Sequence, residues 1–111
     1  MVSTASYPTL RSKQPAALSG GIVKGLLRDQ IGFDGVVITD DLEAPAVPGS
    51  PGATGARALQ AGDDLLLYAN RAASSDQAFK ALVGEVKQGR LDRALIANAY
   101  DRITSLKGDL P

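Results

Sequence analysis

Apolar positions along this chain fall into short continuous runs that alternate with longer periodic stretches. The runs Gly35 to Thr39 and Leu65 to Tyr68 are apolar or β-branched without alternation, and turn residues bound them. Such runs are typical of strands that are buried on both faces of a parallel sheet. A weaker strand pattern stands at the very start of the chain.

Between and after these runs, apolar residues recur at three- and four-residue spacing, which predicts helices. The expected helices are about Gly20 to Arg28, Thr54 to Ala61, Ser75 to Gly89 and Asp92 to Lys107. Ser19 and Ser75 are suited to cap the first and third of them, and Gly89 and Gly108 are suited to end the third and fourth. The stretch Ala44 to Gly55 is rich in proline and glycine, so we expect a long exposed loop there.

The alternation of strands and helices predicts an α/β fold in which parallel strands are joined by right-handed crossovers. Only three strands are expected, so the sheet would have two open edges that attract further strands. The residues expected to form the core are Ile22, Leu26, Val37, Leu59, Leu66, Phe79, Val83, Leu95 and Ile103.

Size and composition indicate one ordinary globular domain. The chain has 111 residues, of which 44% are hydrophobic and 22% charged, and 12 basic residues balance 12 acidic ones. Neither nucleic acid nor a membrane surface is an expected partner, because basic residues are not clustered. No signal peptide is recognisable and there is no cysteine, so the compartment stays unknown, cytoplasmic or exported.

Candidate chemistry lies where the expected strands end. Asp40 and Asp41 follow the first clear strand, and Asn70 lies on the same rim beyond the next one. A carboxylate in that position can act as a nucleophile, a general base or a metal ligand, or it can simply bind backbone donors of the loop.

A metal site or another cofactor is not expected. The chain has no histidine or cysteine, and the remaining acidic residues considered, Asp34, Glu43, Asp63 and Asp64, show no metal-ligand spacing. The segment Ser19-Gly20-Gly21 could cradle a phosphate before a helix, but it matches neither the P-loop nor the dinucleotide pattern.

The segment from Ile31 to Glu43, IGFDGVVITDDLE, resembles the nucleophile segment of glycoside hydrolase family 3, and the bacterial β-N-acetylhexosaminidase branch matches best. Ser6-Tyr7-Pro8 with Pro15 to Ser19 resembles the loop after the family's sixth barrel strand. Ala58 to Leu67 resembles the helix that leads into the eighth strand, and Leu91 to Leu106 resembles the closing helix.

This resemblance implies that residues 1–111 are a C-terminal fragment of a TIM (β/α)8 barrel, covering about the last three βα units. It implies that Asp40 is the catalytic nucleophile of a retaining glycosidase whose carbohydrate substrate carries a terminal β-linked N-acetylglucosamine. Asp41 resembles the frequent acidic neighbour of the nucleophile. Ala44-Pro45 departs from the family, which usually has methionine followed by a small residue.

In the hexosaminidase branch the acid/base is a histidine on an earlier loop, and this chain contains no histidine. We therefore expect negligible turnover from the chain by itself, with substrate-binding residues unknown. Met1 falls inside what the resemblance makes the sixth strand, which suggests a truncated reading frame or a deliberate fragment.

Two other interpretations remain open from the sequence. One is a non-catalytic α/β module that uses its open sheet edges to self-associate or to complete a complementary barrel fragment. The other is a phosphoacceptor receiver with Asp40 as the acceptor, although the acidic cluster and the lysine that receivers require do not occur here.

Overall fold

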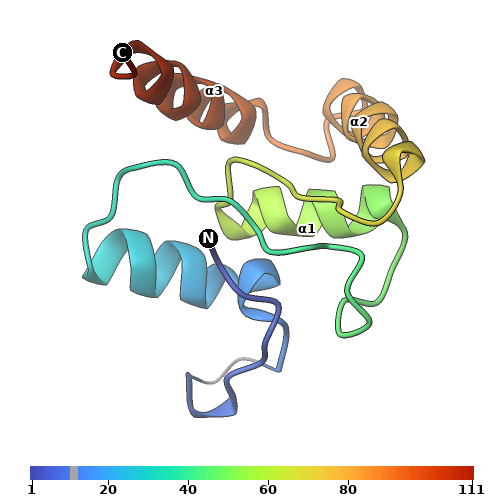
Figure 1. The fold of residues 1–111 in the computed structure, drawn as a ribbon, viewed down its shortest axis with the longest axis horizontal. Coiled ribbons are helices and arrows are strands. Elements are labelled where there is room, and N and C mark those ends of the chain that lie inside the picture. The colour runs from blue at the N-terminus through green and yellow to red at the C-terminus, as the bar shows by residue number, and fades with distance from the viewer. Residues whose placement is uncertain (11–12) are drawn as a thin grey trace.

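The computed structural model describes residues 1–10 and 13–111. The helical elements, in chain order, are η1 (Pro8–Leu10), η2 (Ala16–Leu18), η3 (Gly21–Gln30), α1 (Pro51–Ala61), α2 (Ala72–Lys87) and α3 (Arg93–Gly108). Figure 1 shows α1 between η3 on one side and the pair α2 and α3 on the other. The extended segments run between these helices.

The extended segments lie parallel, as expected, but none of them forms a regular strand in the described residues. The first segment (around Val2), the central segment (around Ile38 and Thr39) and the third segment (around Leu65) are joined by isolated parallel bridges between Val2 and Thr39 and between Ile38 and Leu65. The backbone N–H of Asp40 donates to Val2 O at 2.8 Å, and that of Thr39 donates to Leu65 O at 3.0 Å. The described residues therefore show isolated parallel pairings where a regular three-stranded sheet was expected.

The first expected helix is present but has a different form. Residues Gly21–Gln30 form a π-helix, and the chain leaves it at Ile31, whose N–H donates to Leu26 O. Its N-cap is Gly20, so the expected cap at Ser19 is one residue too early. Val23 is its buried residue.

Helix α1 begins inside the stretch expected to be a loop. Ser50 caps it by accepting a hydrogen bond from Ala53 N at 3.4 Å, and Pro51 takes the first helical position, where its missing N–H costs nothing. Gly62 ends it with φ of 115°, a left-handed conformation that favours glycine. The loop before it is anchored by the buried Val47, so the expectation of an exposed loop over the whole stretch is wrong.

The last two helices differ in how well their starts were predicted. Helix α3 has Asp92 as its N-cap, which accepts from Ala94 N at 2.9 Å, close to the expected start. Helix α2 begins at Ala72, so the expected cap at Ser75 is wrong. Arg71 stands at the N-cap position, but its side chain accepts no hydrogen bond from the helix.

Two small clusters form the core. Leu18, Leu42, Val47 and Ala58 form one, against which Leu66 and Tyr68 pack. Val23, Val37 and Ala61 form the other, with Val2 and Leu27 beside them. Of the expected core, Val37 and Leu59 are buried, whereas Phe79 is 67% exposed, which contradicts its expected place.

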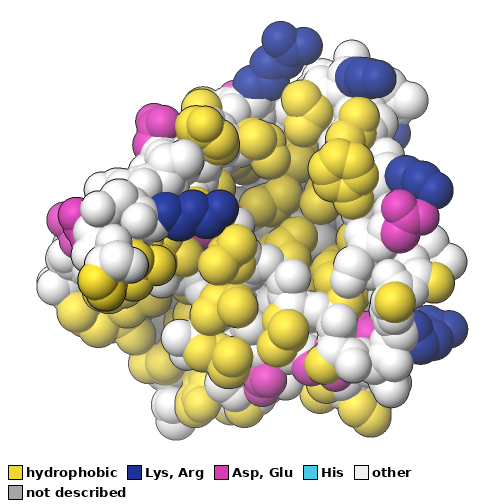
Figure 2. All heavy atoms as spheres, turned by 45° about the horizontal axis from the view of Figure 1, so that its top comes forward, with side chains coloured by type: hydrophobic (Ala, Val, Ile, Leu, Met, Phe, Trp, Pro, Cys, Tyr) yellow, Lys and Arg dark blue, Asp and Glu magenta, His cyan; other side chains and the backbone are white. Residues whose placement is uncertain are grey.

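Phe79 instead borders a hollow on the face formed by α2 and α3, where hydrophobic side chains gather (Figure 2). This apolar hollow of about 340 Å³ is lined by Phe79, Leu82, Val83, Val86, Lys87 and Ile96. In the described part of the chain, no helix combines the length and apolarity that crossing a membrane requires.

Candidate active site

Asp40 lies at the carboxyl end of the central extended segment. Its backbone N–H donates to Val2 O of the neighbouring segment, and its Oδ1 accepts from Asp41 N at 2.8 Å. No donor among the described residues bonds its other carboxylate oxygen. The half-buried Asp40 therefore keeps one oxygen available for chemistry.

Asp41 has a structural task. Its Oδ1 accepts from Glu43 N at 2.9 Å and from Ala69 N at 3.1 Å. It thereby joins the loop that follows the central segment to the loop that follows the third segment. Both aspartates thus bind backbone donors, but only Asp41 uses its carboxylate to connect the two loops.

Glu43 links these two loops more strongly. Its Oε2 accepts from Asn70 N at 2.8 Å and from Arg71 N at 3.1 Å. Its Oε1 accepts from Ser74 Oγ at 2.5 Å and from Arg71 Nε at 3.4 Å. The hydrogen bond from Ser74, followed by those from the two backbone N–H groups and Arg71, lowers the pKa of Glu43 to about 2 against the opposing effect of desolvation.

The rim expected from the sequence is thus assembled by the structure, since Asp40, Asp41 and Asn70 come from two loops that are hydrogen-bonded together. The sequence reasoning missed Glu43, Arg71 and Ser74 as members of this network. Glu43 stood only among acids without metal-ligand spacing, and its partners lie 27 to 31 residues further along the chain. No short-range pattern marks such contacts.

A polar pocket of about 180 Å³ opens between the two loops. Its lining residues are Leu42, Glu43, Val47, Gly49, Pro51, Asn70 and Arg71. It begins two residues after Asp40, on the side of the rim where α2 starts.

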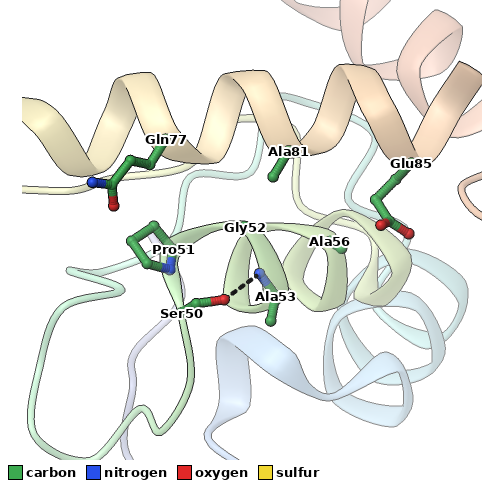
Figure 3. Close-up of a pocket in the computed structure, with 8 residues that line it drawn as sticks. All are labelled: Ser50, Pro51, Gly52, Ala53, Ala56, Gln77, Ala81 and Glu85. Atoms are coloured by element: carbon green, nitrogen blue, oxygen red, sulfur yellow. Dashed lines mark hydrogen bonds between the residues drawn. The ribbon is translucent and has the colours of Figure 1, made fainter.

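A larger pocket, of about 500 Å³, lies between α1 and α2. In Figure 3, Gln77, Ala81 and Glu85 of α2 extend toward Pro51, Gly52 and Ala56 of α1. The two helices lie close together at Gly52, where a Cβ would lie 2.4 Å from the Ala81 Cβ. This pocket lies beside the contact of the two helices and opens to solvent. None of the rim carboxylates lines it.

Two further acids stand at the opposite end of the third segment. The Asp64 side chain is fully buried and accepts from Arg28 Nη2 at 2.8 Å, from Arg102 Nη2 at 2.8 Å and from Val37 N at 2.8 Å. Both carboxylate oxygens of Asp63 are buried without a hydrogen-bond partner. Desolvation, followed by repulsion from Asp64, raises the pKa of Asp63 to about 7.

No group of histidine, cysteine, aspartate or glutamate side chains suited to hold a metal ion occurs among residues 1–10 and 13–111. At the glycine-containing start of η3, Ser19 O accepts from the N–H groups of Ile22 and Val23. These hydrogen bonds belong to the first turn of the helix.

The sequence profile described as "Glycosyl hydrolase family 3 N terminal domain" matches residues 1–106. An uncharacterized secreted glycosyl hydrolase of Arthroderma benhamiae is 36% identical over 113 residues, which cover 99% of this chain and 32% of that protein. A beta-hexosaminidase of Bordetella avium is 42% identical over 78 residues, which cover 68% of this chain and 22% of that protein.

Solved structures agree with these matches. The beta-N-acetylhexosaminidase of Beutenbergia cavernae superposes with a TM-score of 0.86 at 37% identity, over 96% of this chain and 32% of that one. A glycoside hydrolase family 3 beta-N-acetylglucosaminidase of a Paenibacillus species gives 0.83 at 37% identity, over 88% and 19%. These neighbours are of the TIM-barrel type, and the chain spans about a third or less of each of the four similar proteins.

Proposed function

The chain belongs to the glycosyl hydrolase family 3 N-terminal domain family, and from this we propose that it carries the nucleophile of a retaining β-N-acetylglucosaminidase-like glycoside hydrolase. Asp40 is that nucleophile. The substrate is a carbohydrate with a terminal β-linked N-acetylglucosamine, the sugar named for one of the similar structures.

The observation that carries this proposal is the difference between Asp40 and its neighbours. The carboxylates of Asp41 and Glu43 accept hydrogen bonds from backbone and side-chain donors, and these bonds hold the rim together. Asp40 has a single short-range acceptor contact and lies at the carboxyl end of a parallel segment, where active groups of α/β barrels occur. Of the three rim carboxylates, that of Asp40 is the one that takes no part in joining the two loops among the described residues.

Retention requires two chemical roles. Asp40 attacks the anomeric carbon and forms a covalent glycosyl-enzyme, while an acid protonates the leaving oxygen and later activates water. When the acid is a carboxyl group, it lies about 5–5.5 Å from the nucleophile. Glu43, whose pKa is lowered to about 2, is ionised and cannot protonate a leaving group, and the chain has no histidine to serve instead.

Residues 1–111 correspond, in this proposal, to about the last three βα units of the barrel, as one C-terminal unit. The parallel order of the three extended segments supports this correspondence. The acid and most of the sugar-binding groups then belong to the earlier units, and the unit by itself has negligible turnover.

The test is a hybrid enzyme in which residues 1–111 replace the matching segment of the Beutenbergia cavernae beta-N-acetylhexosaminidase. We expect it to hydrolyse a chromogenic N-acetyl-β-glucosaminide, and Asp40→Asn to lower kcat by about 10³-fold or more, because the covalent step loses its nucleophile. Asp34→Asn, an exposed carboxylate ahead of the central segment, is the matched control and should leave kcat unchanged.

Full activity of the Asp40→Asn hybrid would refute the assignment of the nucleophile. The 111-residue chain alone, assayed with the same substrate, should show no turnover. Activity of the isolated chain that disappears in Asp40→Asn would overturn the conclusion that the acid comes from elsewhere.

A further inference from the structure

The polar pocket beside the rim has two chemically different walls. Pro51 supplies an apolar surface, with Leu42 and Val47 almost fully buried beside it, and Asn70 and Arg71 form a polar side. A sugar ring has the matching pair of surfaces, since its C–H face is apolar and its hydroxyl edge forms hydrogen bonds. At about 180 Å³ the pocket is smaller than the roughly 300–1,000 Å³ of sites for drug-sized ligands, so it suits a single ring.

The polar side offers unused donors. The side chain of Arg71 is 72% exposed, and only its Nε contacts Glu43, so its two Nη groups bind no other described residue. The side-chain amide of Asn70 is likewise without a partner in the described part of the chain. A guanidinium presents its donors as a planar fork that can bind two neighbouring oxygens at once.

Glu43 fixes this side without competing for the occupant. Its carboxylate already accepts from Ser74 Oγ and from the backbone N–H groups of Asn70 and Arg71. The backbone of both donor residues is therefore held in place while their side chains stay free. Around the pocket there are three carboxylates, those of Asp40, Asp41 and Glu43, against the single positive charge of Arg71. This excess of negative charge disfavours an anionic occupant.

The pocket also lies within reach of the nucleophile. Residues that are two and three positions apart along a chain are separated by at most about 7 Å and 11 Å between Cα atoms. Leu42 and Glu43, which line the pocket, are therefore no further than that from Asp40. A ring bonded to the sugar that Asp40 attacks can span this distance.

Resting on the proposed function, we infer that this pocket binds the neutral sugar unit on the leaving-group side of the bond that Asp40 attacks. Arg71 and Asn70 bind its hydroxyl or acetamide oxygens, and Arg71 is the main specificity-determining residue. The chain thereby favours oligosaccharides over simple glycosides.

The test is a titration of the ¹⁵N-labelled 111-residue chain with N,N′-diacetylchitobiose, followed by NMR. We expect saturable shifts of the backbone amide signals of Gly49, Asn70 and Arg71. Arg71→Ala should weaken this binding by about tenfold, the scale of a hydrogen bond to a charged donor. Glucuronic acid, an anionic sugar, should bind more weakly than N-acetylglucosamine.

Arg93→Ala is the matched control. Arg93 is an exposed arginine that begins α3, beyond the far end of the 16-residue α2, and its removal should leave the titration unchanged. If Arg71→Ala disturbs folding, Asn70→Ala provides the second variant, since its backbone N–H still donates to Glu43.

The absence of saturable shifts, or shifts of equal affinity in both pocket variants, would overturn the inference. Tighter binding of glucuronic acid would overturn the assignment of a neutral occupant. The titration involves no bond cleavage, so its failure is distinct from a failure of Asp40 to act as nucleophile in the hybrid enzyme.

Discussion

Glu43 and Asp63 are carboxyl groups at opposite extremes of hydrogen bonding. Glu43 accepts from four donors, which lowers its pKa to about 2. Asp63 accepts from none, and burial raises its pKa to about 7. Folding therefore favours the charged form of the first and the neutral form of the second.

These shifts act in different pH ranges. The stabilising effect of Glu43 is present above its unfolded pKa of 4.5 and is lost as the pH falls toward 2. Asp63 binds its proton more tightly in the folded chain, so its effect is present below the unfolded pKa of 3.8 and is lost as the pH rises through 7.

Asp63→Asn should therefore flatten the pH dependence of stability above pH 4.5. The free energy of unfolding of the unmodified chain should fall between pH 4.5 and 7.5, because Asp63 has to ionise without a partner. Urea unfolding at several pH values in this range measures the slope. An equally steep slope in Asp63→Asn would show that another group is responsible.

At the residue level, the sequence predicted which polar residues follow the extended segments. Asp40, Asp41 and Asn70 could be placed on one rim because each follows an apolar run that reads as a strand. The network around Glu43 could not be predicted, since its partners are 27 to 31 residues away and their pairing depends on how two loops meet.

At the level of elements, helices with local end signals were the easier ones to predict. Asp92 caps α3 within its own turn. Helix α2 has no such cap, and the N–H groups before it bind Glu43 of a distant loop, which explains why its start was misplaced. The π-helical form of η3 could not be predicted, because the spacing of its apolar residues is the same as in an ordinary α-helix.

Asp64 connects several elements at one point. It accepts from Arg28 of η3, from Arg102 of α3 and from the backbone of Val37 in the central segment. The side chains of Arg28 and Arg102 are 14% and 29% exposed, whereas that of Asp64 is fully buried. Loss of the carboxylate would leave two partly buried cations without their anion.

Asp64→Asn should lower the free energy of unfolding by about 3–5 kcal/mol, the usual effect of removing one partner from a buried ion pair. Asp76→Asn removes the exposed pair with Lys80 and should change it by less than about 1 kcal/mol. Both values come from urea unfolding at pH 7.5. Similar effects of the two substitutions would contradict the special role of Asp64.

For the whole molecule, the alternation of runs and helices correctly predicted parallel extended segments, and the resemblance of the segment Ile31 to Glu43 correctly indicated glycoside hydrolase family 3. It did not predict that the segments stay joined by isolated bridges. An apolar run marks a buried extended segment, but it does not tell how many of its residues pair with the neighbouring segment.

The hollow over α2 and α3 is an apolar surface of a kind that soluble proteins usually cover. We expect the isolated chain to self-associate through it, with a mass that rises with concentration in light scattering. Phe79→Glu should shift the chain toward the monomer, because it places a charge in the hollow. Lys80→Glu changes the neighbouring exposed position and should not.

A strictly monomeric chain at all concentrations would contradict self-association. Association that persists equally in Phe79→Glu would show that the unpaired edges of the extended segments, and not the hollow, hold the copies together. The second outcome would favour barrel completion along the edges.

The contacts of Asp64 also bear on the rates at which the chain folds and opens. Arg28 and Arg102 lie 36 and 38 residues from it, on either side. Bringing such distant groups together requires closing long loops, whose entropy opposes their early formation. Contacts that are absent from the transition state act on the unfolding rate. We therefore expect the ion pairs of Asp64 with Arg28 and Arg102 to slow unfolding more than they speed folding.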